Sequence, residues 1–387
     1  MTETSGKGRI KIAILFVALT IQAMNAIALI LSSVARLYPE AGPTKIQLVF
    51  TLLTVVSVAG VLLSGKLASV MTKKSIILTA SVLLVVGAFV GWFLTDSMGM
   101  IYLASAIIGL GNGMLRPLAS ALVTEHFTGD ERTSMVGVQD VFTNIGGTLF
   151  NLIGGILAGV YWKRIYLLFL VFLPVAVVVQ VCLPRGTAEK ASSGDKAKLS
   201  TFSYGLGILA LLFGLCWMTF MTNISSLVEF HSLGNAKQAG YVTTVYSVGA
   251  IVINLLLKKL IKGIGKHCLT LSFLLMAISY WIYSYAETMP LLLIAGLFLG
   301  LGFGIFLSVS VAIIPFNVHP ATITMSISLA TAGVSLGGFF TPYVITNIAG
   351  ALGGLVTTRF LVAAVFSTVL TVIVAVITAK AEIKTSR

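Results

Sequence analysis

The chain has 387 residues, of which 57% are hydrophobic and 10% charged, and its mean hydropathy is +1.04. A soluble globular domain carries about 25% charged residues, so these values exclude an ordinary soluble protein. The formal net charge is +13. Because the basic residues are spread between apolar stretches rather than gathered on one face, the charge does not indicate a nucleic-acid partner.

Apolar stretches follow one another along the whole chain. A helix needs roughly 20 apolar residues to cross the bilayer core, and none of the stretches alternates apolar and polar residues as the strands of a membrane barrel do. The stretches that are long enough are residues 12–35, 46–69, 76–95, 99–123, 134–160, 165–183, 202–227, 239–261, 267–286, 290–314, 322–349 and 357–379. The sequence therefore predicts an all-α membrane protein with twelve transmembrane helices.

A polar stretch at residues 185–200 is the one long break in hydrophobicity. Six predicted spans precede it and six follow, so we expect two six-helix halves, 1–184 and 201–387, joined by a cytoplasmic linker. Short runs recur 191 positions apart: Gly109–Gly113 returns as Gly300–Gly304, and Ile145–Gly147 as Leu336–Gly338. Such self-similarity indicates internal duplication. The two halves are thus predicted to be pseudo-symmetric.

The distribution of Lys and Arg predicts the orientation in the membrane. With a cytoplasmic N-terminus, 18 of the 25 basic residues fall on the inner side. Six fall in outer segments, namely Arg36, Lys45, Lys163, Arg164, Lys237 and Arg359. This excess fits the positive-inside rule. We therefore expect a multi-pass protein of the cytoplasmic (inner) membrane with both termini in the cytoplasm. The first apolar run is longer than the core of a signal peptide and is predicted to be a span.

Short loop motifs support a family assignment. Gly65 is followed by the basic pair Lys73-Lys74 between spans two and three, Gly265-Lys266 lies between spans eight and nine, and Trp162–Tyr166 follows span five. Twelve spans around a cytoplasmic linker, with these motifs, resemble the major facilitator superfamily. The resemblance implies a secondary transporter that moves a small solute by alternating access, without a cofactor.

The chain departs from that family at informative positions. Ser69 and Thr72 stand where the motif after span two has Asp and Gly. Ser105 stands where many proton-coupled members have Arg in span four, and Phe150-Asn151 stands where many antiporters have Gly-Pro in span five. These departures argue against a drug/proton antiporter of the usual kind. An exporter of a hydrophobic drug or metabolite remains the alternative function.

Two charged residues lie well inside predicted spans, where charge is costly and usually functional. Arg116 in span four and Asp140 in span five lie roughly 12–14 Å from the nearest span end at 1.5 Å per residue. Equal depth on consecutive helices predicts that they come close together. The positions 191 residues later are Leu307 and Thr331, so both charges belong to one half only. They form either a structural ion pair or a functional one.

Polar residues accompany both charges at helical spacing. Ser105, Asn112 and Ser120 share a face with Arg116, and Thr143, Asn144, Gly147 and Asn151 share one with Asp140. A polar face with a charge at its centre favours a water-filled cavity. We expect Arg116 to bind the solute and Asp140 to couple transport to protons. The other predicted solute-binding residues are Asn112, Asn144, Gln22, Asn25, Asn223, Tyr246 and Asn254.

The run Gly111–Pro117, with Asn144-Ile145-Gly146 after it, is similar to proton-dependent oligopeptide transporters. In that family a Lys before the proline takes part in proton and substrate handling. The chain has Gln22 to Asn25 in place of that family's Glu-x-x-Glu-Arg motif in the first span, which argues against peptides. Because Arg stays protonated and its fork fits a carboxylate, we expect a small organic anion, such as a monocarboxylate, moved by proton symport or by exchange.

Other classes of protein have less support. The sequence contains no zinc-protease motif, nucleophile elbow or phosphate loop, and its four histidines lie at span ends, so an enzyme is not expected. Cys182, Cys216 and Cys268 lack metal-ligand spacing, and no metal is expected. A channel, which needs rings of repeated polar residues, or a membrane scaffold fits less well. The expected partners are a small-molecule substrate, protons and the lipid bilayer, with the protein as a monomer.

Overall fold

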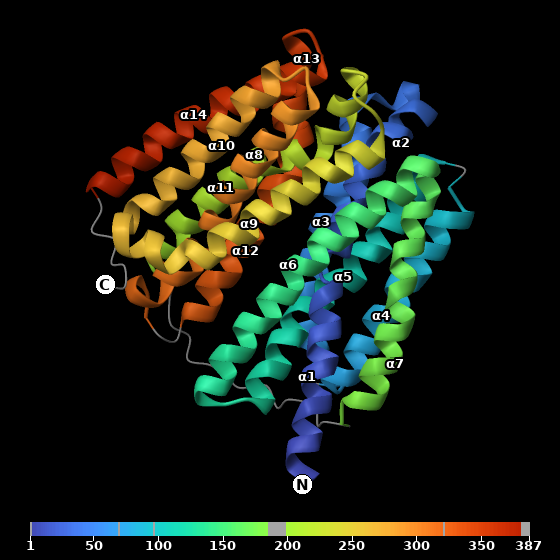
Figure 1. Ribbon diagram of the computed structural model, residues 1–387, viewed down its shortest axis with the longest axis vertical. Coiled ribbons are helices and arrows are strands. Elements are labelled where there is room, and N and C mark those ends of the chain that lie inside the picture. Colours follow the sequence, from blue (N-terminus) through green and yellow to red (C-terminus); the bar gives the residue numbers. More distant parts are fainter. Residues whose placement is uncertain (1, 69, 96, 185–198, 320–321, 381–387) are drawn as a thin grey trace. The chain divides into compact units, whose positions relative to one another are not determined.

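The computed structural model describes residues 2–68, 70–95, 97–184, 199–319 and 322–380 (Figure 1), and all regular elements in this part of the chain are helical. Twelve helical segments there are long and apolar enough to cross a membrane. They are Lys7–Leu37, Pro39–Leu67, Lys73–Phe93, Met98–Val123, Ser134–Val160, Trp162–Cys182, Thr201–Phe230, Ala236–Leu256, Cys268–Tyr285, Met289–Ile314, Met325–Ala351 and Val356–Lys380. The prediction of an all-α membrane protein with twelve spans is confirmed.

The chain divides into two compact units. Unit 1 comprises Met1–Ser33 and Leu52–Ser192, and unit 2 comprises Val34–Thr51 and Ser193–Arg387. The end of the first span and the beginning of the second therefore pack within unit 2. The predicted linker at residues 185–200 lies almost wholly outside the described residues.

Some spans are not continuous α-helices. The first is built from α1 (Thr2–Thr20), a 3₁₀ segment (Ala23–Ile30) and α2 (Leu31–Leu37), and the sixth from a 3₁₀ segment (Trp162–Val171) and α7 (Phe172–Cys182). In the eleventh, α12 (Ile323–Thr341) continues through a π-helical turn (Pro342–Thr346) into α13 (Asn347–Ala351). Pro342 has no N–H to donate to the preceding turn, and this removes one bond of the regular α-helical ladder at the start of the π turn.

In unit 1, α1 lies along α6 (Gly129–Val160), and α4 (Lys73–Phe93) packs on α5 (Met98–His126) and α7 (Figure 1). Glycines allow helices to approach closely in this unit. A Cβ atom on Gly109 would collide with the carbonyl oxygen of Leu53 on α3 (Gly42–Leu67), and one on Gly146 with that of Leu19. Small residues in such positions let backbones come into contact.

Unit 2 repeats the same contacts. Its pairs are α8 (Thr201–Phe230) with α12, α9 (Ala236–Ile264) with α11 (Met289–Asn317), and α10 (Cys268–Tyr285) with α14 (Val356–Lys380). A Cβ on Gly300 would collide with the carbonyl oxygen of Tyr246, and one on Gly337 with that of Leu211. Gly300 and Gly337 follow Gly109 and Gly146 by 191 positions. The repeated glycine runs therefore mark equivalent helix crossings in the two units.

Candidate functional site

Arg116 and Asp140 lie in the interiors of α5 and α6 of unit 1, and both side chains are exposed. The positive charge of Arg116 acts electrostatically on Asp140. No ion pair joins Arg116 to Asp140, in contrast to Lys7–Glu131, Arg36–Glu229 and Lys73–Glu125 elsewhere in the described part of the chain. The two charges are thus neighbours with their hydrogen-bonding groups uncommitted to each other.

Local sequence places Arg116 beside a weak point of α5. The helix runs through Pro117, which has no N–H to donate to the carbonyl group of Gly113 one turn earlier. A Cβ on Gly113 would in turn collide with the carbonyl oxygen of Ser57 on α3. Arg116 therefore extends from a turn that is held by close backbone packing and lacks one backbone hydrogen bond.

A glutamine that the sequence analysis did not single out connects the two helices next to the charges. Gln139 precedes Asp140, and its Nε2 donates to Oγ of Ser120, one turn after Arg116, over 3.3 Å. The Asn144 side chain instead donates to the backbone carbonyl group of Asp140 on its own helix, over 2.9 Å. The sequence could have pointed to Gln139, because a polar side chain inside a span is costly unless it is hydrogen-bonded.

The first span borders the same face. Nδ2 of Asn25 donates to Oε1 of Gln22 over 3.2 Å, and Nδ2 of Asn112 on α5 contacts Sδ of Met24 at 3.0 Å. The Gln22 side chain also packs against Gly147 of α6. The structure thus brings Gln22, Asn25 and Asn112 to adjoining elements of unit 1.

Three oxygen atoms on α5 and α6 are buried without a hydrogen-bond partner. They are Oγ of Ser105, Oδ1 of Asn112 and Oε1 of Gln139. Such atoms are rare in folded proteins, where buried polar groups are almost always hydrogen-bonded. These atoms mark places on α5 and α6 where the protein alone does not complete the hydrogen bonding.

Asn223 of unit 2 lies in a fully buried cluster rather than on an open face. Its Oδ1 accepts from Nε2 of Gln47 at 2.7 Å and from Nη1 of Arg359 at 2.8 Å. Oε1 of Gln47 accepts from Oγ1 of Thr346, in the π-helical turn, at 2.7 Å. Arg359, predicted on the outer side at the start of span 357–379, lies in the first turn of α14, and its side chain is buried against Asn223.

The remaining predicted residues lie on α9 and do not approach Asn223 through any hydrogen bond. The Tyr246 hydroxyl accepts from Nε1 of Trp217 at 2.9 Å, and the Tyr246 ring contacts the rings of Phe220 and Phe303 in tilted arrangements. Asn254 is exposed, and its Oδ1 accepts from Oγ of Ser308 at 2.7 Å. Unit 2 thus has a buried aromatic cluster at Tyr246 and an exposed amide at Asn254.

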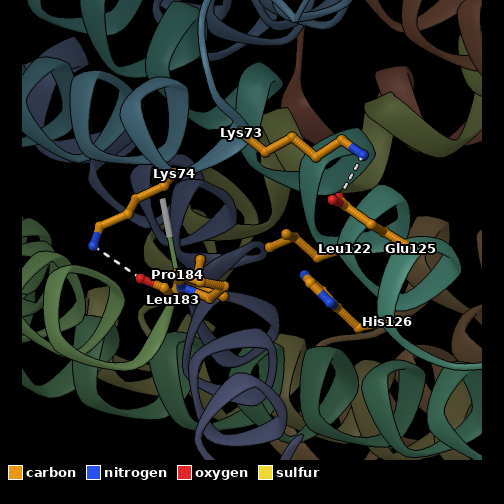
Figure 2. A pocket seen from close by; sticks show the side chains of 7 residues that line it. All are labelled: Lys73, Lys74, Leu122, Glu125, His126, Leu183 and Pro184. Carbon is orange, nitrogen blue, oxygen red and sulfur yellow. Dashed lines mark hydrogen bonds and ion pairs between the residues drawn. The ribbon is translucent and has the colours of Figure 1, made fainter. Parts of the chain in front are cut away.

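The basic pair of the loop motif borders a separate pocket of unit 1 (Figure 2). Nζ of Lys73 lies 2.9 Å from Oε2 of Glu125 on α5, and Nζ of Lys74 donates to the carbonyl oxygens of Gln180 and Leu183 at the end of α7. The pocket is also lined by Leu122, His126 and Pro184. These lysines connect the ends of α4, α5 and α7.

The fold and this site define a class of protein. The two units repeat the same helix crossings. Charged and polar side chains lie midway along membrane-spanning helices, at Arg116 on α5 and Asp140 on α6. Solute transporters are built in this way. The family model of the Major Facilitator Superfamily matches residues 12–234 and again 206–387. The chain belongs to this superfamily and is a transporter of that type.

Similar proteins agree with this class. The chain is 25% identical over 159 residues to the multidrug transporter protein MdtP of Bacillus subtilis, a stretch that covers 39% of this chain and 29% of that relative's length. It is 23% identical over 270 residues to a TsgA homolog of Erwinia tasmaniensis, covering 67% of this chain and 68% of the relative.

Solved structures share the fold at low identity. The nucleoside transporter NupG matches with a TM-score of 0.77 and 15% identity, covering 99% of this chain and 100% of its own. The transporter PepTSo matches with a TM-score of 0.76 and 13% identity, covering 97% and 98%. A bacterial homolog of the lysosomal transporter Spinster gives 0.67 and 15%, covering 97% and 95%.

Proposed function

We propose that this transporter carries a small organic anion, such as a monocarboxylate, with Arg116 as the anion-binding residue and Asp140 as the proton-coupling residue. The observation that carries the proposal is that both charges are exposed inside consecutive spans and form no ion pair. A purely structural pair would be expected to close into direct hydrogen bonds, because a charge inside a membrane is costly when unpaired.

The chemistry around Arg116 suits a carboxylate that also carries polar groups. The guanidinium fork donates two parallel hydrogen bonds to a carboxylate. The unpartnered oxygens of Asn112 and Gln139 are acceptors, and they complement O–H or N–H groups of a solute. Asn144, Gln22 and Asn25 extend the polar face. We assign Tyr246 and Asn254 to contacts that the second unit makes during transport, and Asn223 to a structural cluster.

Coupling follows from the neighbouring charges. A cation near Asp140 favours the ionised carboxylate, and neutralising that cation favours protonation. A solute anion at Arg116 would then promote proton uptake at Asp140, which is the linkage that a symporter needs. The same residues also support anion exchange without protons.

We further propose that the protein is a monomer of the cytoplasmic membrane with both termini inside, and that its two units alternate access to the solute. Spin labels at Thr128, after α5, and at Val318, after α11, measure this motion. Two distance populations whose balance shifts with a transported anion support the mechanism. One distance that stays unchanged under all conditions contradicts it.

Export of a hydrophobic drug or metabolite is the second candidate. The stretch shared with a multidrug transporter and the aromatic cluster around Tyr246 favour it. The two candidates differ in the charge of the substrate. In the described part of unit 1, Asp140 is the only carboxylate deep inside a span that could pair with a cationic drug. Reconstituted protein that exports drugs and ignores all organic anions would establish this second candidate.

The variant Arg116→Lys tests the anion assignment. It keeps the charge and loses the fork, so we expect normal expression with much weaker anion binding, measured by thermal shift and by uptake into liposomes. The double variant Arg116→Leu/Asp140→Thr copies the equivalent positions of the other unit. If both variants transport as the parent does, the pair is structural and the anion assignment is wrong.

A further inference from the structure

Arg359 is a buried cation whose one hydrogen-bond partner in the described part of the chain is neutral. It lies in the first turn of α14 and is 9% exposed, and its Nη1 donates to Oδ1 of Asn223 at 2.8 Å. The carboxylate of Glu229, on the same helix as Asn223, is paired with Arg36 at 3.3 Å. The guanidinium carries several further N–H donors, and no described residue accepts from them.

This position is electrostatically unfavourable for a cation in two ways. Transferring an ionised group from water into a protein interior is costly unless the group is paired. In addition, the first turn of a helix is the positive end of its dipole, where cations are destabilising. An anion next to the guanidinium would offset both effects. The site lacks a negative charge, so an anion is the ligand that fits it.

One turn before Asn223 on α8, a buried hydroxyl group also lacks a hydrogen-bond partner. Oδ1 of Asn223 is already shared by Gln47 and Arg359. Its amide nitrogen donates to the carbonyl group of Thr219, one turn earlier on α8. The hydroxyl oxygen of Thr219 is fully buried and has no hydrogen-bond partner. This hydroxyl is therefore a second donor next to the cluster, independent of Arg359.

We propose that Arg359 is an anion site in unit 2 that holds a small monovalent anion: inorganic chloride, or the carboxylate group of a small acid. Burial restricts the ligand to a small species, and the positive charge of Arg359, which has only a neutral partner among the described residues, selects a negative one. The site is separate from Arg116 and does not depend on the function proposed for that residue.

Thermal unfolding of the full-length protein in detergent tests the site. At constant ionic strength, replacing sodium gluconate, whose anion is too bulky for the cluster, by sodium chloride should raise the Tm in a saturable way, because a ligand that binds only the folded state stabilises it. A rise with chloride assigns the site to an inorganic anion. A rise with acetate and none with chloride assigns it to a carboxylate.

Matched variants locate the effect. Arg359→Gln keeps an N–H donor towards Asn223 and removes the charge, so the anion-dependent rise in Tm should disappear. Arg36→Gln, which removes an exposed arginine paired with Glu229, should keep the rise. Arg116→Gln should keep it too, and this separates the site from the proposed transport function.

A complementary variant covers the case in which Arg359→Gln does not fold. Asn223→Asp supplies a carboxylate to the guanidinium from within the chain. We expect it to raise the Tm in gluconate and to abolish the response to chloride or acetate. An unchanged Tm of the parent protein in every anion, or an Asn223→Asp variant that responds as the parent does, overturns the proposal.

Discussion

Gln47 and Asn223 are 176 positions apart, yet they share a buried hydrogen bond of 2.7 Å. The other end of the Gln47 amide accepts from Thr346, also at 2.7 Å. Gln47 thus joins α3 to α8 and to the π-helical turn after α12, within unit 2. A glutamine that is 2% exposed is stable here because both ends of its amide are hydrogen-bonded.

We predict that Gln47→Leu destabilises the protein. The change preserves volume but removes both bonds and leaves the buried hydroxyl of Thr346 without its acceptor, a loss of about 1–3 kcal/mol. Gln139→Leu is the matched control, since Gln139 is also buried but already has one unpartnered oxygen. Thermal unfolding should show a clear fall in Tm for Gln47→Leu and little change for Gln139→Leu. Equal falls would contradict this reading of the cluster.

The fold was largely predictable because its determinants are local in the sequence. Apolar runs of span length and repeated glycines follow directly from what the bilayer and close helix packing demand. The Gln47 cluster was not predictable, because its partners are distant in sequence and each looks ordinary on its own. Arg359 lies close to a span end, where a basic residue usually reaches towards water, and nothing local indicates that it turns inward.

The candidate site was predictable only in part. Arg116 and Asp140 were identified from depth alone, and the structure places them on α5 and α6 of one unit. Depth could not tell whether they bond directly, because this depends on side-chain direction. Asn223 was identified from its polarity inside a span, and polarity alone could not tell that its side chain is hydrogen-bonded to Gln47 and Arg359.

The glycine contacts predict opposite effects for two substitutions on one helix. Gly146→Ala places a Cβ against the carbonyl oxygen of Leu19, so α1 and α6 must separate; overpacking of this kind typically costs about 1–3 kcal/mol. Gly137→Ala, on the same helix, meets nothing within 4 Å and should be neutral or stabilising by about 0.5–1 kcal/mol. The Tm of each purified variant measures this, and a stable Gly146→Ala protein would show that the crossing is looser than described.

The two lysine pairs in unit 1 differ in burial, and their removal should differ accordingly. The Lys73 side chain is 9% exposed in its pair with Glu125, whereas the Lys7 side chain is 52% exposed in its pair with Glu131. Lys7→Met should cost about 0–1 kcal/mol, as exposed pairs do. Lys73→Met should cost more, yet less than the roughly 3–5 kcal/mol of a fully buried pair, because Glu125 is half-exposed. Chemical denaturation measures the free energy of unfolding of both variants. Equal losses would show that burial does not determine the contribution of these pairs.

Asp140→Asn tests proton coupling in the proposed transport cycle. The amide preserves shape but cannot take up or release a proton, so a pH gradient should no longer drive accumulation of the anion. Counterflow exchange needs no net proton movement and should continue, because Arg116 is unchanged. Transport into liposomes, with and without an imposed pH gradient, measures both activities.

A control on the same helix separates coupling from general damage. Glu131→Gln removes an exposed carboxylate near the start of α6 and should leave gradient-driven accumulation intact. If Asp140→Asn loses exchange as well as accumulation, the residue acts in binding or folding rather than in coupling. If accumulation by Asp140→Asn keeps the pH dependence of the parent protein, protons are coupled elsewhere and the role proposed for Asp140 is wrong.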